Sequence, residues 1–140
     1  MKTLLASMAL SLALAGSAFA GDVTADRQTV MKNVGAATGM GAKMLKGEIE
    51  FSAAAANLVL RTMNTAALGY GHLFPEGSES GNDTEASPAI WSDRAGFDAA
   101  VAKFVSDTSA NVSDMDSFKA AFGAATANCG ACHKAYRVKN

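Results

Sequence analysis

Three residues near the C-terminus have the types and the spacing for covalent attachment and metal ligation. The segment reads Cys129-Gly130-Ala131-Cys132-His133, and the chain contains no other cysteine. In a helix, residues three and four apart lie on one face, so both sulfurs and the imidazole would point the same way. A Cys-x-x-Cys-His motif is the attachment signal of c-type haem. We therefore predict one covalent haem c, held by two thioethers from Cys129 and Cys132, with His133 as an iron ligand.

The cysteine pair has three other interpretations, which the rest of the sequence does not favour. A thioredoxin-type redox pair normally follows a strand, and the chain has no βαβ pattern. A zinc site takes four ligands. The chain offers only two cysteines and two histidines, and His72 lies far from the motif. A structural disulfide is the third alternative. His72 is also the only residue available for bis-histidine coordination of an iron.

The first 20 residues have the features of a secretory signal peptide. Lys2 provides a positive start, an apolar run extends from Leu4 to Ala15, and a small-residue cleavage site ends at Ala20. The apolar run is too short to span a membrane, and an uncleaved anchor is the alternative. We predict that residues 1–20 are removed, that residues 21–140 form the mature domain, and that this domain is exported to the periplasm without membrane insertion.

Composition limits the class of function. Without Lys2, the chain keeps 11 basic and 13 acidic side chains, a net charge of about −2. Nucleic-acid binding requires a basic surface, so this balance argues against a nucleic-acid partner. No nucleophilic or hydrolytic constellation is visible, and peroxidase chemistry would need polar groups over an open iron site. The sequence therefore favours a carrier over an enzyme.

Four segments have helical composition and an apolar stripe, and they predict one all-α domain. The first extends from about residue 24 to 46, with Gly47 as its stop signal, and the second from about 52 to 68. The third begins near Ser92-Asp93 and the fourth near Ser113-Asp114. Together they predict an antiparallel four-helix bundle that encloses the haem.

The connection between the second and third helices is expected to be a long crossover. Residues 69–90 contain both prolines and many Gly, Ser, Asn and Asp residues, which is typical of a loop. In the fourth helix, apolar residues recur every four and three positions, and this seam includes both cysteines: Phe118, Phe122, Ala125, Cys129, Cys132 and Tyr136. The seam predicts that the haem attaches to the inner face of that helix.

The chain resembles a class II cytochrome c over residues 24–139. That family has its haem motif near the C-terminus of a four-helix bundle. Besides the motif itself, the matching landmarks are Arg27-Gln28, residues 73–78 and residues 88–91. The resemblance implies that His133 is the proximal ligand. It also implies roles around the haem for four further residues: Arg27 and Gln28 at the propionates, Glu85 near the haem edge and Arg137 beside the proximal pocket.

The resemblance makes Met31 the decisive position, because in this family the corresponding residue lies over the open side of the iron. In a low-spin subgroup, a methionine here binds the iron. In the cytochromes c′, the sixth site is empty and an apolar side chain guards it. The surrounding Met31-Lys32-x-x-Gly35 resembles the low-spin subgroup, and Gly130 stands where cytochromes c′ usually carry lysine. Met40, Met44 and Met63 are rival sulfur ligands.

Two functions follow from the two subgroups. With His133 and Met31 as ligands, the protein would carry one electron by Fe(II)/Fe(III) cycling and dock with periplasmic or membrane redox proteins. With an empty sixth site, it would be a high-spin cytochrome c′ that binds nitric oxide or carbon monoxide, and Met31 would only pack. The resemblance also implies a homodimer through the first two helices, where small residues permit close packing: Gly35, Ala36, Gly39 and Ala42.

Overall fold

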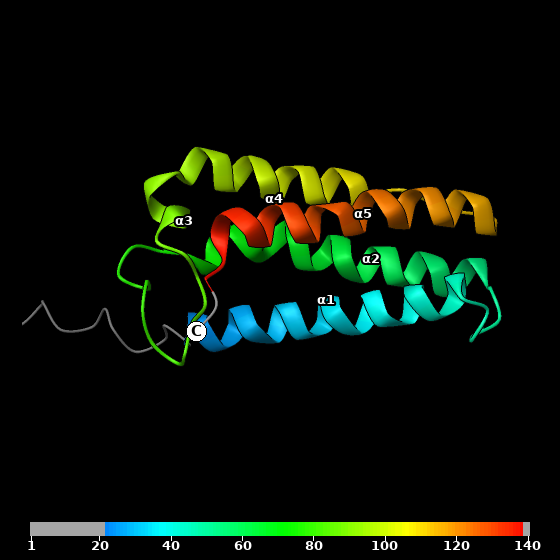
Figure 1. Ribbon diagram of the computed structural model, residues 1–140, viewed down its shortest axis with the longest axis horizontal. Coiled ribbons are helices and arrows are strands. Elements are labelled where there is room, and N and C mark those ends of the chain that lie inside the picture. Colours follow the sequence, from blue (N-terminus) through cyan, green and yellow to red (C-terminus); the bar gives the residue numbers. More distant parts are fainter. Residues whose placement is uncertain (1–21, 139–140) are drawn as a thin grey trace, which may run out of the picture.

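Four long helices make up most of the protein, for which a computed structural model describes residues 22–138. They are α1 (Val23–Leu45), α2 (Ala53–Tyr70), α4 (Arg94–Thr108) and α5 (Met115–Tyr136). Successive long helices run in opposite directions (Figure 1). This arrangement confirms the predicted all-α antiparallel bundle. The predicted signal peptide lies outside the described residues. Among residues 22–138, no helix has the length and apolar character needed to cross a bilayer.

Each long helix begins at a side chain that caps its free backbone N–H groups. Asp22, Ser52, Asp93 and Asp114 accept hydrogen bonds from the first turns of α1, α2, α4 and α5. In α5 the cap is reciprocal, because the backbone N–H of Asp114 also donates to the hydroxyl of Ser117. The predicted starts of the last two helices are therefore confirmed to within two residues.

The crossover is less irregular than predicted. It contains a 3-10 turn, η1 (Gly71–Leu73), and a short helix, α3 (Ala89–Ser92). The second helix also continues to Tyr70, two residues past its predicted end. The Tyr70 ring packs edge-on against Phe74 at a centroid distance of 5.1 Å. This tertiary contact stabilises the last turn, which the glycines around Tyr70 would not favour by themselves.

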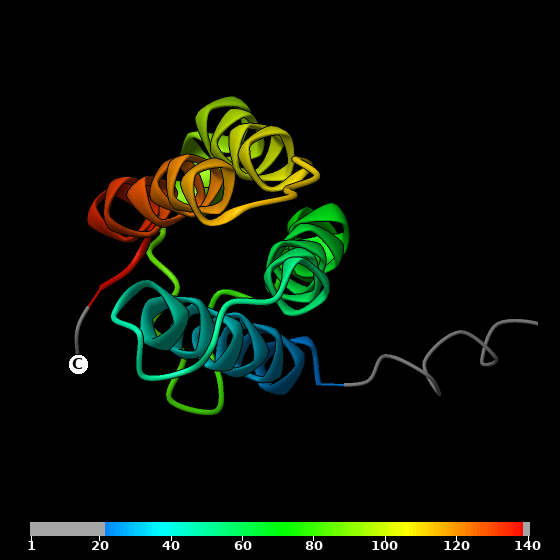
Figure 2. The same ribbon diagram turned by 90° about the vertical axis from the view of Figure 1, so that its right-hand side faces the viewer.

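Two apolar clusters fill the bundle, and they leave a space between α1 and α5. The larger cluster joins α1, α2 and α5 and includes Leu60, Met63 and Phe118. The smaller one joins the crossover to α4 through Phe74 and Phe97. Around the bundle, α1 packs on α2, α2 on α4, and α4 on α5, whereas α1 and α5 touch little (Figure 2). The cavity described below occupies the less tightly packed side.

At Gly41, α1 approaches α5 closely. A Cβ atom at this position would overlap the ring of Phe122, which is buried. We expect Gly41→Ala to lower the free energy of unfolding by about 1–3 kcal/mol, because overpacking forces neighbouring side chains to move. Gly123→Ala is the matched control, since its Cβ would meet open space. That change should raise stability by about 0.5–1 kcal/mol. Thermal unfolding of the two haem-loaded variants measures both effects. If both variants changed stability in the same direction, the close contact between Gly41 and Phe122 would be contradicted.

Candidate haem-binding site

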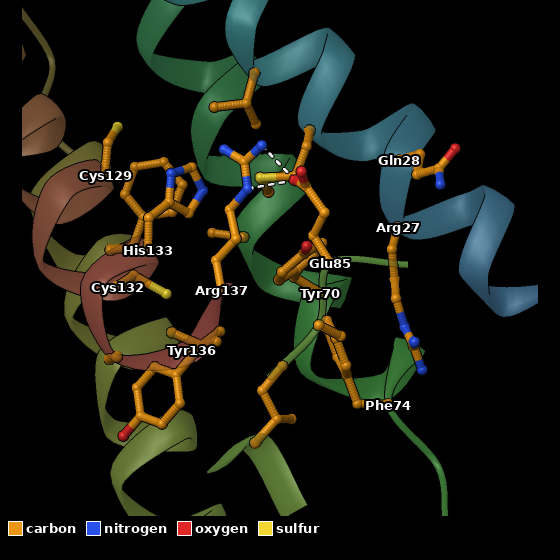
Figure 3. Close-up of a pocket in the computed structure, with 18 of the residues that line it drawn as sticks. Arg27, Gln28, Tyr70, Phe74, Glu85, Cys129, Cys132, His133, Tyr136 and Arg137 are labelled. Carbon is orange, nitrogen blue, oxygen red and sulfur yellow. Dashed lines mark hydrogen bonds and ion pairs between the residues drawn. The ribbon is translucent and has the colours of Figure 1, made fainter. Parts of the chain in front are cut away.

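A cavity of about 650 Å³ lies between α1, the end of α2, the crossover, α4 and α5. This volume is within the usual range for cofactor sites. The structure brings together every site residue predicted from the sequence, because all of them line this one cavity: Arg27, Gln28, Met31, Glu85, Cys129, Cys132, His133 and Arg137. Figure 3 labels all of these except Met31. The rest of the lining is largely apolar, with Phe97, Val101 and Phe104 of α4 on one wall.

The α5 wall carries the two cysteines and the histidine. Cys129 and Cys132 are free and half-buried, and burial raises the pKa of both thiols, so they are protonated at neutral pH. Partial burial and the positive charge of Arg137 lower the pKa of His133. A lowered pKa favours the neutral imidazole, which is the form that binds a metal. The wall thus presents two attachment sulfurs and one neutral nitrogen donor.

The α1 wall carries Met31. It is half-buried and packs against the edge of the larger apolar cluster. Met44 and Met63 belong to that cluster and are fully buried, and Met40 packs against it outside the cavity. Among the methionines that the structure describes, only Met31 lines the cavity. The structure therefore separates it from its three rivals, which sequence periodicity could not do.

Arg27 is buried and holds the crossover against α1. Its side chain is only 4% exposed. Its Nε donates to the carbonyl of Leu73 at 2.6 Å, and a terminal nitrogen donates to the carbonyl of Ser78 at 2.8 Å. The other terminal nitrogen donates to the Ser78 hydroxyl. The guanidinium carbon also lies 4.1 Å from the centre of the Phe74 ring. Three of its five N–H groups are committed to these contacts.

Gln28, Glu85 and Arg137 lie where the crossover meets α1 and α5. Gln28 donates to the carbonyl of Asn82 at 2.8 Å. Arg137 forms an ion pair with Glu85, drawn as dashed lines in Figure 3. Next to this pair, Val138 donates its backbone N–H to the carbonyl of Glu85 at 2.9 Å. These contacts tie the end of α5 to the crossover and close one side of the cavity.

The structure adds lining residues that sequence reasoning missed, and it places His72 elsewhere. Tyr70 and Phe104 line the cavity, although no motif identified them. The aromatic content of α2 and α4 was the only available signal, and it does not distinguish core from cavity. Lys32 lines it too and was noted only as part of the local string around Met31. His72 lies in η1, where it is exposed and does not line the cavity.

The chemistry of this donor set fits a covalent haem. A porphyrin needs an apolar slot, two adjacent thiols, a nitrogen donor for the iron and cationic groups for its carboxylates. The cavity supplies apolar walls from α1 and α4, and α5 supplies Cys129, Cys132 and His133. Three cationic side chains line it, against two acidic ones: Arg27, Lys32 and Arg137 against Asp83 and Glu85. The balance suits an anionic group.

Comparison with known proteins agrees with this chemistry. A family profile described as "Cytochrome C'" matches residues 22–137. A cytochrome c′ from Rhodopseudomonas palustris is 38% identical, over 99% of this chain and 99% of its own. A cytochrome c-556 from Agrobacterium fabrum is 35% identical, over 99% of this chain and 97% of its own. The solved structure of cytochrome c′ from Rhodopseudomonas palustris matches with a TM-score of 0.81 and 37% identity, covering 86% of this chain and 98% of that one.

Proposed function

Because the chain belongs to the cytochrome c′ family of class II cytochromes and binds covalent haem c, we propose that Cys129 and Cys132 form the thioethers and that His133 and Met31 bind the iron. With these two ligands the protein is a one-electron carrier. Haem c supplies an iron that alternates between Fe(III) and Fe(II). His133 and Met31 would supply the two protein ligands of the iron, and a thioether ligand would favour the reduced form. The proposed role is electron carriage without a catalytic step.

One observation carries the assignment of the sixth ligand. Met31 is the methionine that lines the cavity from α1, while His133 lines it from α5. The two helices touch little, so the space between them is open to a flat group. Thioether sulfur and imidazole nitrogen are the ligand pair of electron-carrying cytochromes. The positions of Met31 and His133 therefore support His/Met ligation.

The visible spectrum of the purified holoprotein tests this assignment directly. We expect sharp α and β bands in the reduced form, a sulfur-to-iron charge-transfer band in the oxidised form, and no change on adding carbon monoxide. A broad high-spin spectrum that shifts with carbon monoxide would overturn Met31 ligation. In both outcomes the thioether-linked haem itself is detected separately, as colour that stays with the denatured chain.

A second candidate function rests on the relatives. The chain is at least as similar to a cytochrome c′ as to a cytochrome c-556. In this reading Met31 packs over an empty sixth site, and the protein binds nitric oxide or carbon monoxide in the apolar cavity. The same spectrum that overturns Met31 ligation supports this function. His133, Cys129 and Cys132 keep the same roles in both.

The remaining site residues hold the haem and its surroundings in place. We assign to Arg27 a contact with a haem propionate. Gln28 and the Glu85–Arg137 pair keep the crossover and the end of α5 in position around the haem edge. In this assignment, Gln28 and the Glu85–Arg137 pair do not bind the haem themselves but keep the cavity closed around it.

Location and partners follow from the export signal and the exposed part of the site. We propose that residues 1–20 are cleaved and that the domain from residue 21 to 140 works in the periplasm. Gln28, Lys32 and Arg137 are exposed where they border the cavity. Periplasmic or membrane redox proteins would dock on this border, through the small, short-lived contacts typical of electron transfer. The slightly negative net charge gives no support for a nucleic-acid partner.

A homodimer through α1 and α2 is proposed from a shallow groove on their outer face. The groove is lined by Asn33, Ala36, Ala37, Met40, Leu58, Val59 and Thr62. Leu58 is 59% exposed there, beside the apolar side chains of Met40 and Val59 that also line the groove. Of the four small residues singled out in the sequence, Ala36 lines the groove, whereas Gly35 lines the haem cavity.

Replacing Leu58 by glutamate tests the dimer. The buried charge would oppose association, so we expect the Kd to rise by at least tenfold without loss of haem. Leu68→Glu is the matched control, because Leu68 is 62% exposed on the same helix but lies outside the groove. Sedimentation velocity over a range of concentrations measures both variants. Equal association of the wild type and Leu58→Glu would place the interface elsewhere.

A further inference from the structure

Tyr70 lines the haem cavity at the last residue of α2. Its ring is held in an edge-on contact with Phe74, with an angle of 74° between the ring planes. In Figure 3 it lies between Arg137 and Arg27, in the middle of the labelled side chains. Its hydroxyl makes no hydrogen bond with any residue that the structure describes. The polar end of this side chain is therefore available within the cavity.

The other tyrosine of the chain shows the contrast. Tyr136 also contributes to the cavity wall, but its hydroxyl donates to a carboxylate oxygen of Asp93 at 2.9 Å. Among the described residues, Tyr136 has a partner for its hydroxyl and Tyr70 has none. The Tyr70 hydroxyl is accessible from the cavity, because no buried side-chain polar atom of residues 22–138 is left without a partner. It is therefore free to bond to the group that the cavity holds.

The charges around Tyr70 indicate what that partner is. Burial is the main cause that raises the pKa of Tyr70 to about 12, so the hydroxyl keeps its proton and acts as a donor. The thiol of Cys132 adds to this increase in the pKa of Tyr70, whereas the positive charges of Arg27 and Arg137 oppose it. An anionic acceptor is favoured where cations and a neutral donor converge. The propionate carboxylates are the anionic acceptors of a haem.

We infer that the Tyr70 hydroxyl donates a hydrogen bond to a haem propionate and so acts as a positioning residue that tunes the reduction potential. The inference rests on the chain's binding of haem c, and it holds for either state of the sixth ligand. A hydrogen bond donated to the propionate partly neutralises the negative charge that the propionate places near the iron. This favours Fe(II) over Fe(III), because less negative charge remains to stabilise the more positive iron.

The Tyr70→Phe variant of the holoprotein keeps the ring and removes only the donor. We expect its propionate bending band in resonance Raman spectra to shift from the wild-type position. We also expect its midpoint potential to fall, by up to tenfold in the equilibrium constant, or about 59 mV for one electron. The spin-state bands should stay as in the wild type. A failure of His133/Met31 ligation would show in those bands and not in the propionate band, so the two proposals are tested separately.

A second variant keeps the test decisive even if Tyr70→Phe folds poorly. The chain has two tyrosines, so Tyr136→Phe leaves Tyr70 as the single reporter of phenol hydrogen bonding. Ultraviolet resonance Raman of this variant should show a tyrosine that donates to a strong acceptor, with the propionate band unmoved. A Tyr70 without a donor bond would overturn the inference. If the holoprotein binds carbon monoxide, an effect of Tyr70→Phe confined to the stretching band of the iron-bound carbon monoxide would overturn it too, because the hydroxyl would then contact that ligand and not a propionate.

Discussion

Replacing both Cys129 and Cys132 by serine is expected to abolish covalent attachment of haem. A thioether requires sulfur, and the chain contains no other cysteine to substitute for these two. Both sulfurs lie on the cavity wall formed by α5, where each is half-buried and free. Haem staining of the denatured protein after gel electrophoresis measures the effect. The wild type should stain, and the double variant should show complete loss.

The single variants refine this expectation. Cys129→Ser and Cys132→Ser each leave one sulfur on the wall, so each should keep a single thioether and a fainter, shifted α band. If the double variant still stained after denaturation, attachment would have to occur elsewhere, and the assignment of both cysteines would be wrong. The matched control is Ser113→Ala, an exposed serine before α5 that does not line the cavity.

Replacing Met31 by leucine is expected to convert a low-spin haem into a high-spin haem that binds carbon monoxide. Leucine conserves the volume and the apolar character of methionine, so the fold should lose less than about 1.5 kcal/mol. Only the sulfur disappears, and with it the sixth ligand. The midpoint potential should fall at the same time, because thioether ligation raises it. Absorption spectra with and without carbon monoxide measure the conversion, which should be nearly complete.

Met63→Leu provides the matched control for this change. Met63 is fully buried in the larger apolar cluster and does not line the cavity. The same substitution there removes a thioether without touching the haem, so the low-spin spectrum should persist. If Met31→Leu left the spectrum unchanged as well, Met31 would be ordinary packing. A high-spin wild type would then identify the protein as a gas-binding cytochrome c′.

The secondary structure was accessible from the sequence because its signals are local. Asp93 and Asp114 cap the helices that begin one residue later, as their positions before apolar stripes predict. Gly47 follows α1 with a positive φ of 72°, a conformation that suits glycine. The last two residues of α2, up to Tyr70, were missed because a contact with Phe74, and not helix propensity, stabilises them.

The site residues also divide into those that local spacing identifies and those that depend on distant partners. Spacing within one helix places Cys129, Cys132 and His133 together, so a five-residue motif suffices to identify them. Arg27 differs, because its donors reach Leu73 and Ser78, 46 and 51 residues further along the chain. No local pattern reveals such partners, and only resemblance to a family pointed to Arg27 at all.

The sequence alone established the haem motif, the four helices and the starts of the last two at Asp93 and Asp114, because each depends on neighbours within about four positions. Packing of distant segments settled the rest. It placed Met31 across from α5 and buried Met44 and Met63 in the core. It also directed the Arg27 guanidinium to the crossover, and it gave the Tyr70 hydroxyl no partner among residues 22–138, beside the haem site. These features depend on which helix faces meet, and periodicity gives the face of one helix but not its partner.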